Sequence, residues 1–257
     1  MFKLIIYIFS VISFAQTPFD QFKTVDDKNS FKFYGEKYYY EIYWGYINVG
    51  SAMIEVQDVV DVSSGVCAYK IVTNARSSSF IDNFFKVRDI NIAYLDTSFK
   101  RSYGYYKDIN EGNYSYMEYT FFDYPNKRFY GKRIKNKKET VHEGELNNDV
   151  FDVLSSLYLY IGSTEDITKK KQIDIVSKKH RILDVENLGK EKVKTKAGSF
   201  KTYKLEPKVG EDGIFISKKG KSLYVYISED DRIPVMLEAE ISLGSVKAKL
   251  SESKKNH

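Results

Sequence analysis

The chain has 257 residues and a formal net charge of +5. Charged residues make up 29% of it, too many for a chain embedded in a membrane. Its length suits one large β domain or two small ones. A single cysteine, Cys67, excludes an intramolecular disulfide. Aromatic residues make up 16% of the chain, with 22 Tyr and 17 Phe. Because such side chains fit pleated, half-buried surfaces, this composition indicates β-sheet.

Residues 1–15 have the pattern of a secretory signal peptide. Lys3 supplies a positive charge, no charge follows it up to Ala15, and Ser13 and Ala15 place small residues at the −3 and −1 positions before Gln16. The apolar run is too short for a bilayer core of ~30 Å, which takes about 20 residues. We expect cleavage before Gln16 and export, with a short hydrophobic strand or an uncleaved anchor as the alternative.

The next part of the chain changes from irregular to extended. Residues 16–30 are polar and show no periodicity, which predicts a flexible lead-in. Residues 33–56 alternate in the period of a β-strand, and two glycines interrupt them where a strand would bend or bulge. Further short strands are predicted at residues 69–73, 90–94, 114–122 and 127–133.

One segment has the period of a helix. From Val150, apolar residues recur at i, i+3, i+4, i+7, i+8 and i+11, the single stripe of an amphipathic helix. Asp149 can cap the first turn and Gly162 can end the helix. We predict a helix over residues 149–161 that packs this stripe on one face of the sheet, with Asp152 on the polar side.

Short strand patterns resume after the helix. They cover residues 172–176, 180–185, 190–195, 200–207, 213–217, 222–227, 235–241 and 246–250. Residues 251–257 read as a polar tail. We predict one β-rich domain over residues 31–250, with a division in the stretch 162–171 as the alternative. The fold class is mainly β: a strongly curved antiparallel sheet, or an open or incomplete barrel, with the helix 149–161 packed on it.

No catalytic or metal-binding motif stands out in the sequence. The three histidines, His142, His180 and His257, have neither the spacing of metal ligands nor a nucleophile nearby. We therefore predict no catalytic residues, no metal and no cofactor. Acidic residues that are far apart in the sequence but close together in the folded protein are the remaining possibility for a catalytic site.

Residues 76–89 form the densest unusual stretch, in which serines, apolar residues and charges are interleaved. The apolar spacing suits a short helical turn between strands. We predict that its cations receive an anionic head group while aromatic side chains hold an apolar tail. The candidate ligand-binding residues are Arg76, Phe80, Phe84, Phe85, Lys86 and Arg88, with Tyr40, Trp44 and Tyr116 of other strands. The structural alternative is that the phenylalanines plug one end of a barrel and Arg88 pairs with Asp82 or Asp89.

Five segments in order resemble the bacterial domain-of-unknown-function family 3108. They are the opening FYGEKYYYEIYWGYINVGSAM at residues 33–53 and the blocks at 80–89, 149–158, 197–202 and 228–235. Asn48 departs from the small apolar residue of the family pattern. The resemblance implies a curved antiparallel sheet and an exported protein in the periplasm or at the outer membrane of a Gram-negative bacterium. It implies no activity and no catalytic residues.

These observations predict a non-enzymatic envelope protein that binds an apolar or amphiphilic ligand in a groove of its curved sheet. A lipid, a lipoprotein or a glycan would suit such a groove by analogy of fold. The mild net charge does not favour nucleic acid as a partner. The alternatives are a structural or assembly partner without a ligand cavity, and an enzyme acting on envelope polymers.

Overall fold

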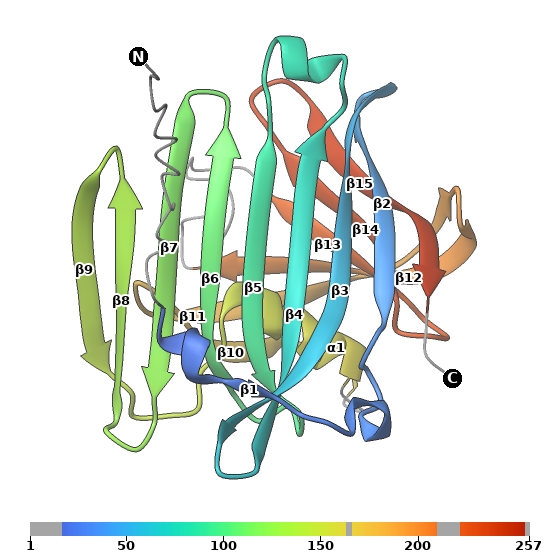
Figure 1. The fold of residues 1–257 in the computed structure, drawn as a ribbon. Coiled ribbons are helices and arrows are strands. Elements are labelled where there is room, and N and C mark those ends of the chain that lie inside the picture. The colour runs from blue at the N-terminus through green and yellow to red at the C-terminus, as the bar shows by residue number, and fades with distance from the viewer. Residues whose placement is uncertain (1–16, 163–165, 210–221, 255–257) are drawn as a thin grey trace, which may run out of the picture.

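The computed structural model describes residues 17–162, 166–209 and 222–254. These residues form one antiparallel sheet of 15 strands and one α-helix, α1 (Val153–Gly162) (Figure 1). The strands are β1 (Lys23–Thr24), β2 (Lys37–Trp44), β3 (Ile47–Ser63), β4 (Val66–Ser77), β5 (Arg88–Asp96), β6 (Ser102–Glu111), β7 (Tyr114–Asp123), β8 (Arg128–Lys135), β9 (Lys138–Glu145), β10 (Lys171–Ser177), β11 (Lys179–Thr195), β12 (Gly198–Val209), β13 (Leu223–Ser228), β14 (Pro234–Glu240) and β15 (Ser245–Lys254). Short 3₁₀ turns lie at η1 (Pro18–Gln21), η2 (Lys28–Ser30) and η3 (Ile81–Asn83).

The strands follow two antiparallel meanders that are joined side by side. Neighbours in the sheet run β10-β11-β12-β13-β14-β15-β2-β3-β4-β5-β6-β7-β8-β9, and the short β1 pairs with β3. The join is between β15 and β2, where Ala248 lies opposite Ile42. The last strand of the chain is therefore held beside its first long strand, which unites both halves in a single sheet.

The sheet curves until its two ends approach each other without pairing. β11 contacts β9, but the described residues contain no hydrogen-bonded pairing between the end strands β9 and β10. The segment before α1 bridges part of this gap. The amide of Phe151 donates to the carbonyl of Asp174 on β10 (2.9 Å), and the carbonyl of Val150 accepts from the amide of Ser102 on β6 (2.8 Å). The prediction of a strongly curved, incomplete barrel with one helix is confirmed.

Helix α1 lies inside the curve, behind β3–β5 and in front of β10–β12 (Figure 1). The largest core cluster accordingly combines side chains of both meanders with the helix. It includes Tyr38, Ile54, Ile71, Leu95, Tyr158, Ile175, Leu183, Leu205 and Ile227. Burying each such apolar side chain contributes roughly 1.5–3 kcal/mol. The inward face of the sheet and the helix thus stabilise each other.

The helix begins four residues later than its apolar stripe predicts. Val150 and Phe151 are extended, because their backbone groups pair with neighbouring strands. Asp149 pairs with Arg101 (2.8 Å) on the surface and does not cap the helix. The cap is Asp152, which the sequence places on a polar face but which is only 3% exposed. Apolar residues at 150 and 151 are compatible with a short extended segment as well as with a first helical turn. The apolar pattern therefore could not show at which residue the helix begins.

Both chain ends of the predicted domain differ from the expectation of irregular structure. Residues 17–30, expected to be flexible, are packed on the outside of the sheet, where Phe19 is buried and stacks on Tyr94 with ring centroids 4.5 Å apart. At the other end, the expected tail begins as part of β15, and Ser253 lies opposite Tyr38. Sequence periodicity missed both because each uses only a few residues whose partners lie far away in the chain.

The remaining strand predictions differ from the structure in three ways. The stretch 33–56, expected as one extended segment that bends at its glycines, turns back at Gly45 and Tyr46 to form the antiparallel pair β2 and β3. The structure adds β6 and β9, where no strand was predicted, and it merges the strands expected at 180–185 and 190–195 into β11 with a bulge. The strand expected at 213–217 and the signal peptide lie outside the described residues. Among the described helices, none is long and apolar enough to cross a membrane.

Candidate ligand-binding cavity

A cavity of about 260 Å³ lies between helix α1 and the inner face of the sheet. Its walls come from both meanders, with residues of β2–β6 from one and of β10–β15 from the other. Helix α1 contributes Val153, Leu154 and Leu157, which are only partly buried although they lie in the interior of the protein. The helix therefore holds the two walls apart and does not fill the space between them.

Most of the wall is aliphatic. Inward residues of seven strands form it: Ala52, Ile54, Ala75, Leu183, Val185, Leu205, Leu223, Val225, Leu237 and Ala248. Leu237 of β14 lies opposite Ala248 of β15 on one side and opposite Val225 of β13 on the other. Small residues such as Ala52, Ala75 and Ala248 leave room that a larger residue would occupy. The β-sheet alternation thus supplies an apolar surface, and residue size supplies the volume.

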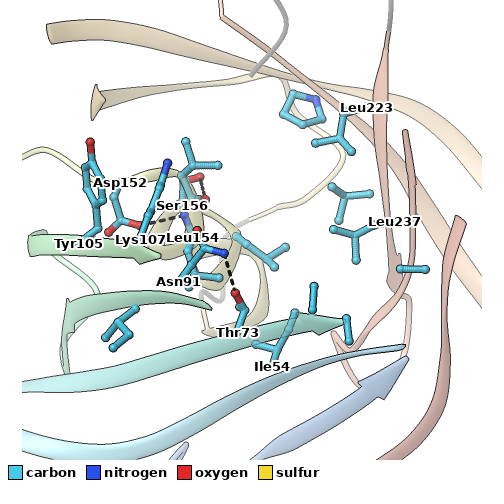
Figure 2. A pocket seen from close by; sticks show the side chains of 18 of the residues that line it. Ile54, Thr73, Asn91, Tyr105, Lys107, Asp152, Leu154, Ser156, Leu223 and Leu237 are labelled. Atoms are coloured by element: carbon cyan, nitrogen blue, oxygen red, sulfur yellow. Dashed lines mark hydrogen bonds between the residues drawn. The ribbon is translucent and has the colours of Figure 1, made fainter. Parts of the chain in front are cut away.

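Polar groups gather at one side of the cavity. Figure 2 shows Lys107 beside Asp152 and Tyr105, with Leu223 and Leu237 on the opposite side. Along the sheet, Thr73 of β4 lies opposite Asn91 of β5, and Asn91 lies opposite Lys107 of β6. The side-chain amide of Asn91 donates to the hydroxyl of Thr73 (3.2 Å). The cavity therefore has one polar wall and one aliphatic wall.

Lys107 is the cationic side chain among the described residues that line the cavity. Its ammonium lies 4.9 Å from the ring centroid of Tyr105, a cation–π contact. It forms no hydrogen bond or ion pair with any described residue. Burial lowers the pKa of Lys107, while the nearby carboxylates Glu118 and Asp152 act in the opposite direction.

Glu118 organises the charges behind Lys107. The side chain is buried, and its carboxylate accepts hydrogen bonds from the hydroxyl of Tyr105 (2.9 Å) and the guanidinium of Arg133 (3.3 Å). The ammonium of Lys178 completes the group at 3.3 Å. These contacts use both oxygens of Glu118. Lys107 forms no ion pair with Glu118 or with any other described carboxylate.

Asp152 is the carboxylate of the cavity wall, and its oxygens are occupied by the helix start. Oδ1 accepts from the amides of Leu154 (2.9 Å) and Ser155 (3.0 Å), and Oδ2 accepts from the hydroxyls of Ser102 and Ser155. Burial raises the pKa of Asp152, although these hydrogen bonds oppose the shift. The residue therefore serves as a buried N-cap that also borders the cavity.

The residues predicted to bind a ligand are dispersed in the structure. Tyr40 lines the cavity, and its hydroxyl donates to the carbonyl of Pro234 (2.7 Å). Trp44 is at the end of β2, where its indole N–H donates to the carbonyl of Leu243 (2.9 Å). The guanidinium of Arg133 stacks on the ring of Tyr116, with the Cζ atom of Arg133 3.7 Å from the centroid of that ring. Of these three, only Tyr40 is among the residues lining the cavity.

The stretch 76–89 forms an exposed loop around η3 at one end of the sheet (Figure 1). Phe80, Phe84 and Phe85 are between 50% and 77% exposed, so they plug nothing. Arg88 pairs with Asp82 at 2.6 Å, as the structural alternative expects. Arg76 and Lys86 are exposed as well, and none of the six residues lines the cavity. Their role in binding stays a prediction.

The polar wall was not predicted from the sequence because no strand was expected at β6. In hindsight Tyr105 and Lys107 alternate with Tyr106 and Asp108, a period of two that places both on the inner face. A lysine facing inward is uncommon, so the ordinary expectation for Lys107 is an exposed position. Only the curvature of the sheet decides that this face encloses a cavity.

The described residues contain no group of three or more His, Cys, Asp or Glu side chains that could hold a metal ion. His142 is half-buried and shares a hydrogen bond with the hydroxyl of Thr120 (2.8 Å), and burial lowers the pKa of His142. His180 lies beside Asp174 (2.8 Å) near the β10–β11 turn. The two histidines are thus engaged separately.

Solved structures with a related fold have little sequence identity to this chain. A β-barrel-like protein of the domain of unknown function DUF1849 from Brucella abortus is 9% identical over 88% of this chain and 99% of its own, with a TM-score of 0.55. A candidate lipoprotein from Parabacteroides distasonis is 11% identical over 86% and 95%, with a TM-score of 0.29. A candidate exported protein with a YmcC-like fold from Bacteroides fragilis is 13% identical over 88% and 99%, with a TM-score of 0.31. The first similarity supports a barrel-like fold and nothing further.

No curated protein matches the chain in sequence. The family model described as protein of unknown function (DUF3108) matches residues 39–251, which span the sheet from β2 to β15 and include the helix. The chain therefore belongs to the DUF3108 family of proteins of unknown function.

Proposed function

We propose that this protein is an exported envelope protein that binds an apolar or amphiphilic ligand inside its curved sheet. The observation that carries the proposal is the cavity between α1 and the sheet, whose walls are mostly aliphatic. A sheet of this kind encloses a ligand when its inward side chains do not fill the interior. A purely structural core would be close-packed, with few voids larger than a water molecule.

The size of the cavity limits the ligand. Its volume of about 260 Å³ is just below the ~300–1,000 Å³ that is usual for small-molecule sites. One hydrocarbon chain suits this space better than a lipid with several acyl chains. The mixed wall, aliphatic on one side and polar around Lys107, favours an amphiphile over a pure hydrocarbon.

Native mass spectrometry of the protein purified from the periplasm, followed by lipid extraction, tests the proposal. A co-purifying single-chain lipid is the expected result. The blocking variant is Ala248→Phe, which projects a ring into the cavity, and the matched control is Lys249→Phe, the next residue on the opposite face of β15. Ala248→Phe should lose the ligand and Lys249→Phe should keep it. A folded wild-type protein that carries no lipid and binds no lipid probe would refute the proposal.

A role as an assembly partner at the envelope is the second candidate, and exposed apolar side chains favour it. Tyr46, Ile47 and Leu243 are exposed in two hairpin turns, and Phe80 and Phe84 are exposed in the loop around η3. These segments lie side by side. The amide of Ser78, in the loop around η3, donates to the carbonyl of Val49 near the β2–β3 turn, and the indole N–H of Trp44 at that turn donates to the carbonyl of Leu243 in the β14–β15 turn. Large exposed apolar groups of this kind mark interaction surfaces.

The two candidates are separated by variants at the exposed loop. The double substitution Phe80→Ser and Phe84→Ser should leave lipid content unchanged if the cavity carries the function. Loss of a cross-linked envelope partner with an unchanged lipid content would instead favour the assembly role. An enzyme acting on envelope polymers finds little support, because Asp152 is the one carboxylate among the described cavity residues and its oxygens are occupied.

A further inference from the structure

The ammonium of Lys107, at the wall of an apolar cavity, has no counter-ion among the described residues. It faces the cavity from the middle of β6, far from the strand ends, where a lysine could reach solvent. Its contact with a described residue is the face of the Tyr105 ring. Charged groups placed in such surroundings are normally paired, since an unpaired buried charge is costly.

No carboxylate among the described residues forms an ion pair with Lys107. Glu118 of β7 is held by Arg133 of β8 and by Lys178 beyond the end of β10. The oxygens of Asp152 accept hydrogen bonds from the start of α1 and from Ser102. Among the described residues, the three cations Lys107, Arg133 and Lys178 therefore face the two carboxylates Glu118 and Asp152, which leaves one positive charge in excess on this side of the cavity.

A second donor lies next to Lys107. Asn91 is the residue directly opposite on β5, and opposite residues on neighbouring strands have Cβ atoms about 4.5–5.5 Å apart. One N–H of the Asn91 amide is directed to Thr73, and the other has no acceptor among the described residues. An ammonium and an amide at this spacing can each donate to one oxygen of a carboxylate.

We propose that Lys107, with Asn91, binds the carboxylate of a single-chain fatty acid whose hydrocarbon chain extends along the aliphatic wall formed by Leu223, Leu237 and Ala248. This assignment rests on the proposed function, since it names the ligand class of the same cavity. It places the anionic head group inside the sheet, whereas the sequence placed it on the exposed loop of residues 76–89. There Arg88 is already paired with Asp82.

The test compares two probes of the same chain length, dodecanoate and dodecanol, by isothermal titration of the delipidated protein. Wild-type protein should bind dodecanoate more tightly than dodecanol. Lys107→Met should weaken dodecanoate binding by about tenfold or more, the factor expected for a lost charge-assisted hydrogen bond, and leave dodecanol unchanged. The control is Lys70→Met on β4, a lysine outside the cavity lining, which should change neither.

The outcomes separate this assignment from the proposed function. Equal binding of both probes by the wild type, or an equal loss of both in Lys107→Met, overturns the role of Lys107 while the cavity function stands. Failure of the folded wild type to bind either probe overturns both.

A measurement on the wild type avoids dependence on the variant's folding. The ¹³C shift of carboxyl-labelled dodecanoate, titrated with pH in the complex, should give a carboxyl pKa below that of the same acid in water. A cation at the carboxylate favours its charged form. An unchanged or raised pKa in the complex contradicts the assignment.

Discussion

The hydroxyl of Ser102, the first residue of β6, donates a hydrogen bond of 2.7 Å to Oδ2 of Asp152. The same carboxylate caps α1 through the amides of Leu154 and Ser155. One buried acidic side chain therefore fixes the start of the helix to the strand that carries Lys107. The position of α1 inside the sheet, and with it the shape of the cavity, depends on this link.

Replacing this cap should destabilise the protein strongly. Asp152→Ala removes an N-cap, which costs about 1 kcal/mol, and leaves the buried hydroxyl of Ser155 without its acceptor, at about 1–3 kcal/mol. We expect the free energy of unfolding in urea to fall by roughly 2–4 kcal/mol. Asp149→Ala, which removes a surface partner of Arg101, is the control and should cost at most about 1 kcal/mol. The reverse order would place the cap at Asp149, as the sequence predicts.

The two sides of α1 should respond differently to truncation. Leu159 is 7% exposed and packed in the core, so Leu159→Ala should cost roughly 2–5 kcal/mol. Leu157 already faces the cavity, so Leu157→Ala should cost about 1 kcal/mol and enlarge the space for a ligand. Chemical denaturation measures both costs. Equal large losses would mean that the cavity is closed in solution.

Two buried tyrosines offer a matched pair. The hydroxyl of Tyr158 is buried without a hydrogen-bond partner among the described residues, whereas that of Tyr40 donates to the carbonyl of Pro234. Tyr158→Phe should therefore be neutral or slightly stabilising, and Tyr40→Phe should cost about 1–2 kcal/mol. Thermal unfolding of the two variants gives the comparison. A clear loss in Tyr158→Phe would reveal a partner for that hydroxyl.

Asp89 should make stability depend on pH. Burial, with Glu111 and Asp108 nearby, raises the pKa of Asp89 from 3.8 to about 6. The folded protein then binds this proton more tightly than the unfolded chain. The contribution of Asp89 to stability is therefore complete below about pH 4 and is lost as the pH rises through about 6. Urea midpoints between pH 4 and 8 should show this fall.

The matching variant is Asp89→Asn, which keeps an acceptor for the amide of Asn110 and removes the titration. Its urea midpoint should change less between pH 4 and 6 than that of the wild type. Asp108→Asn leaves Asp89 in place but removes a neighbouring carboxylate, so the fall should move to lower pH. A wild-type midpoint that rises over this range would contradict the assignment to Asp89.

Several features follow from the sequence alone because they depend on neighbours in the chain. The alternation at residues 114–122 predicts β7 almost residue for residue, since strand periodicity is local. The apolar stripe predicts the one helix, and Gly162 ends it as expected. The resemblance of five ordered segments to the DUF3108 family is confirmed by a match over residues 39–251.

The tertiary structure decided which of these faces became interior. A helix with one apolar stripe is expected on an open face, but the curved sheet surrounds α1, so that Ser155 on its other side is also buried. The helix start moved to Asp152 because Val150 and Phe151 found strand partners in β6 and β10. Lys107 lines the cavity because the curvature of the sheet encloses the face of β6 on which it lies. Pairing of β15 with β2 and the curvature of the whole sheet set the enclosed space, and both depend on contacts between residues far apart in the chain.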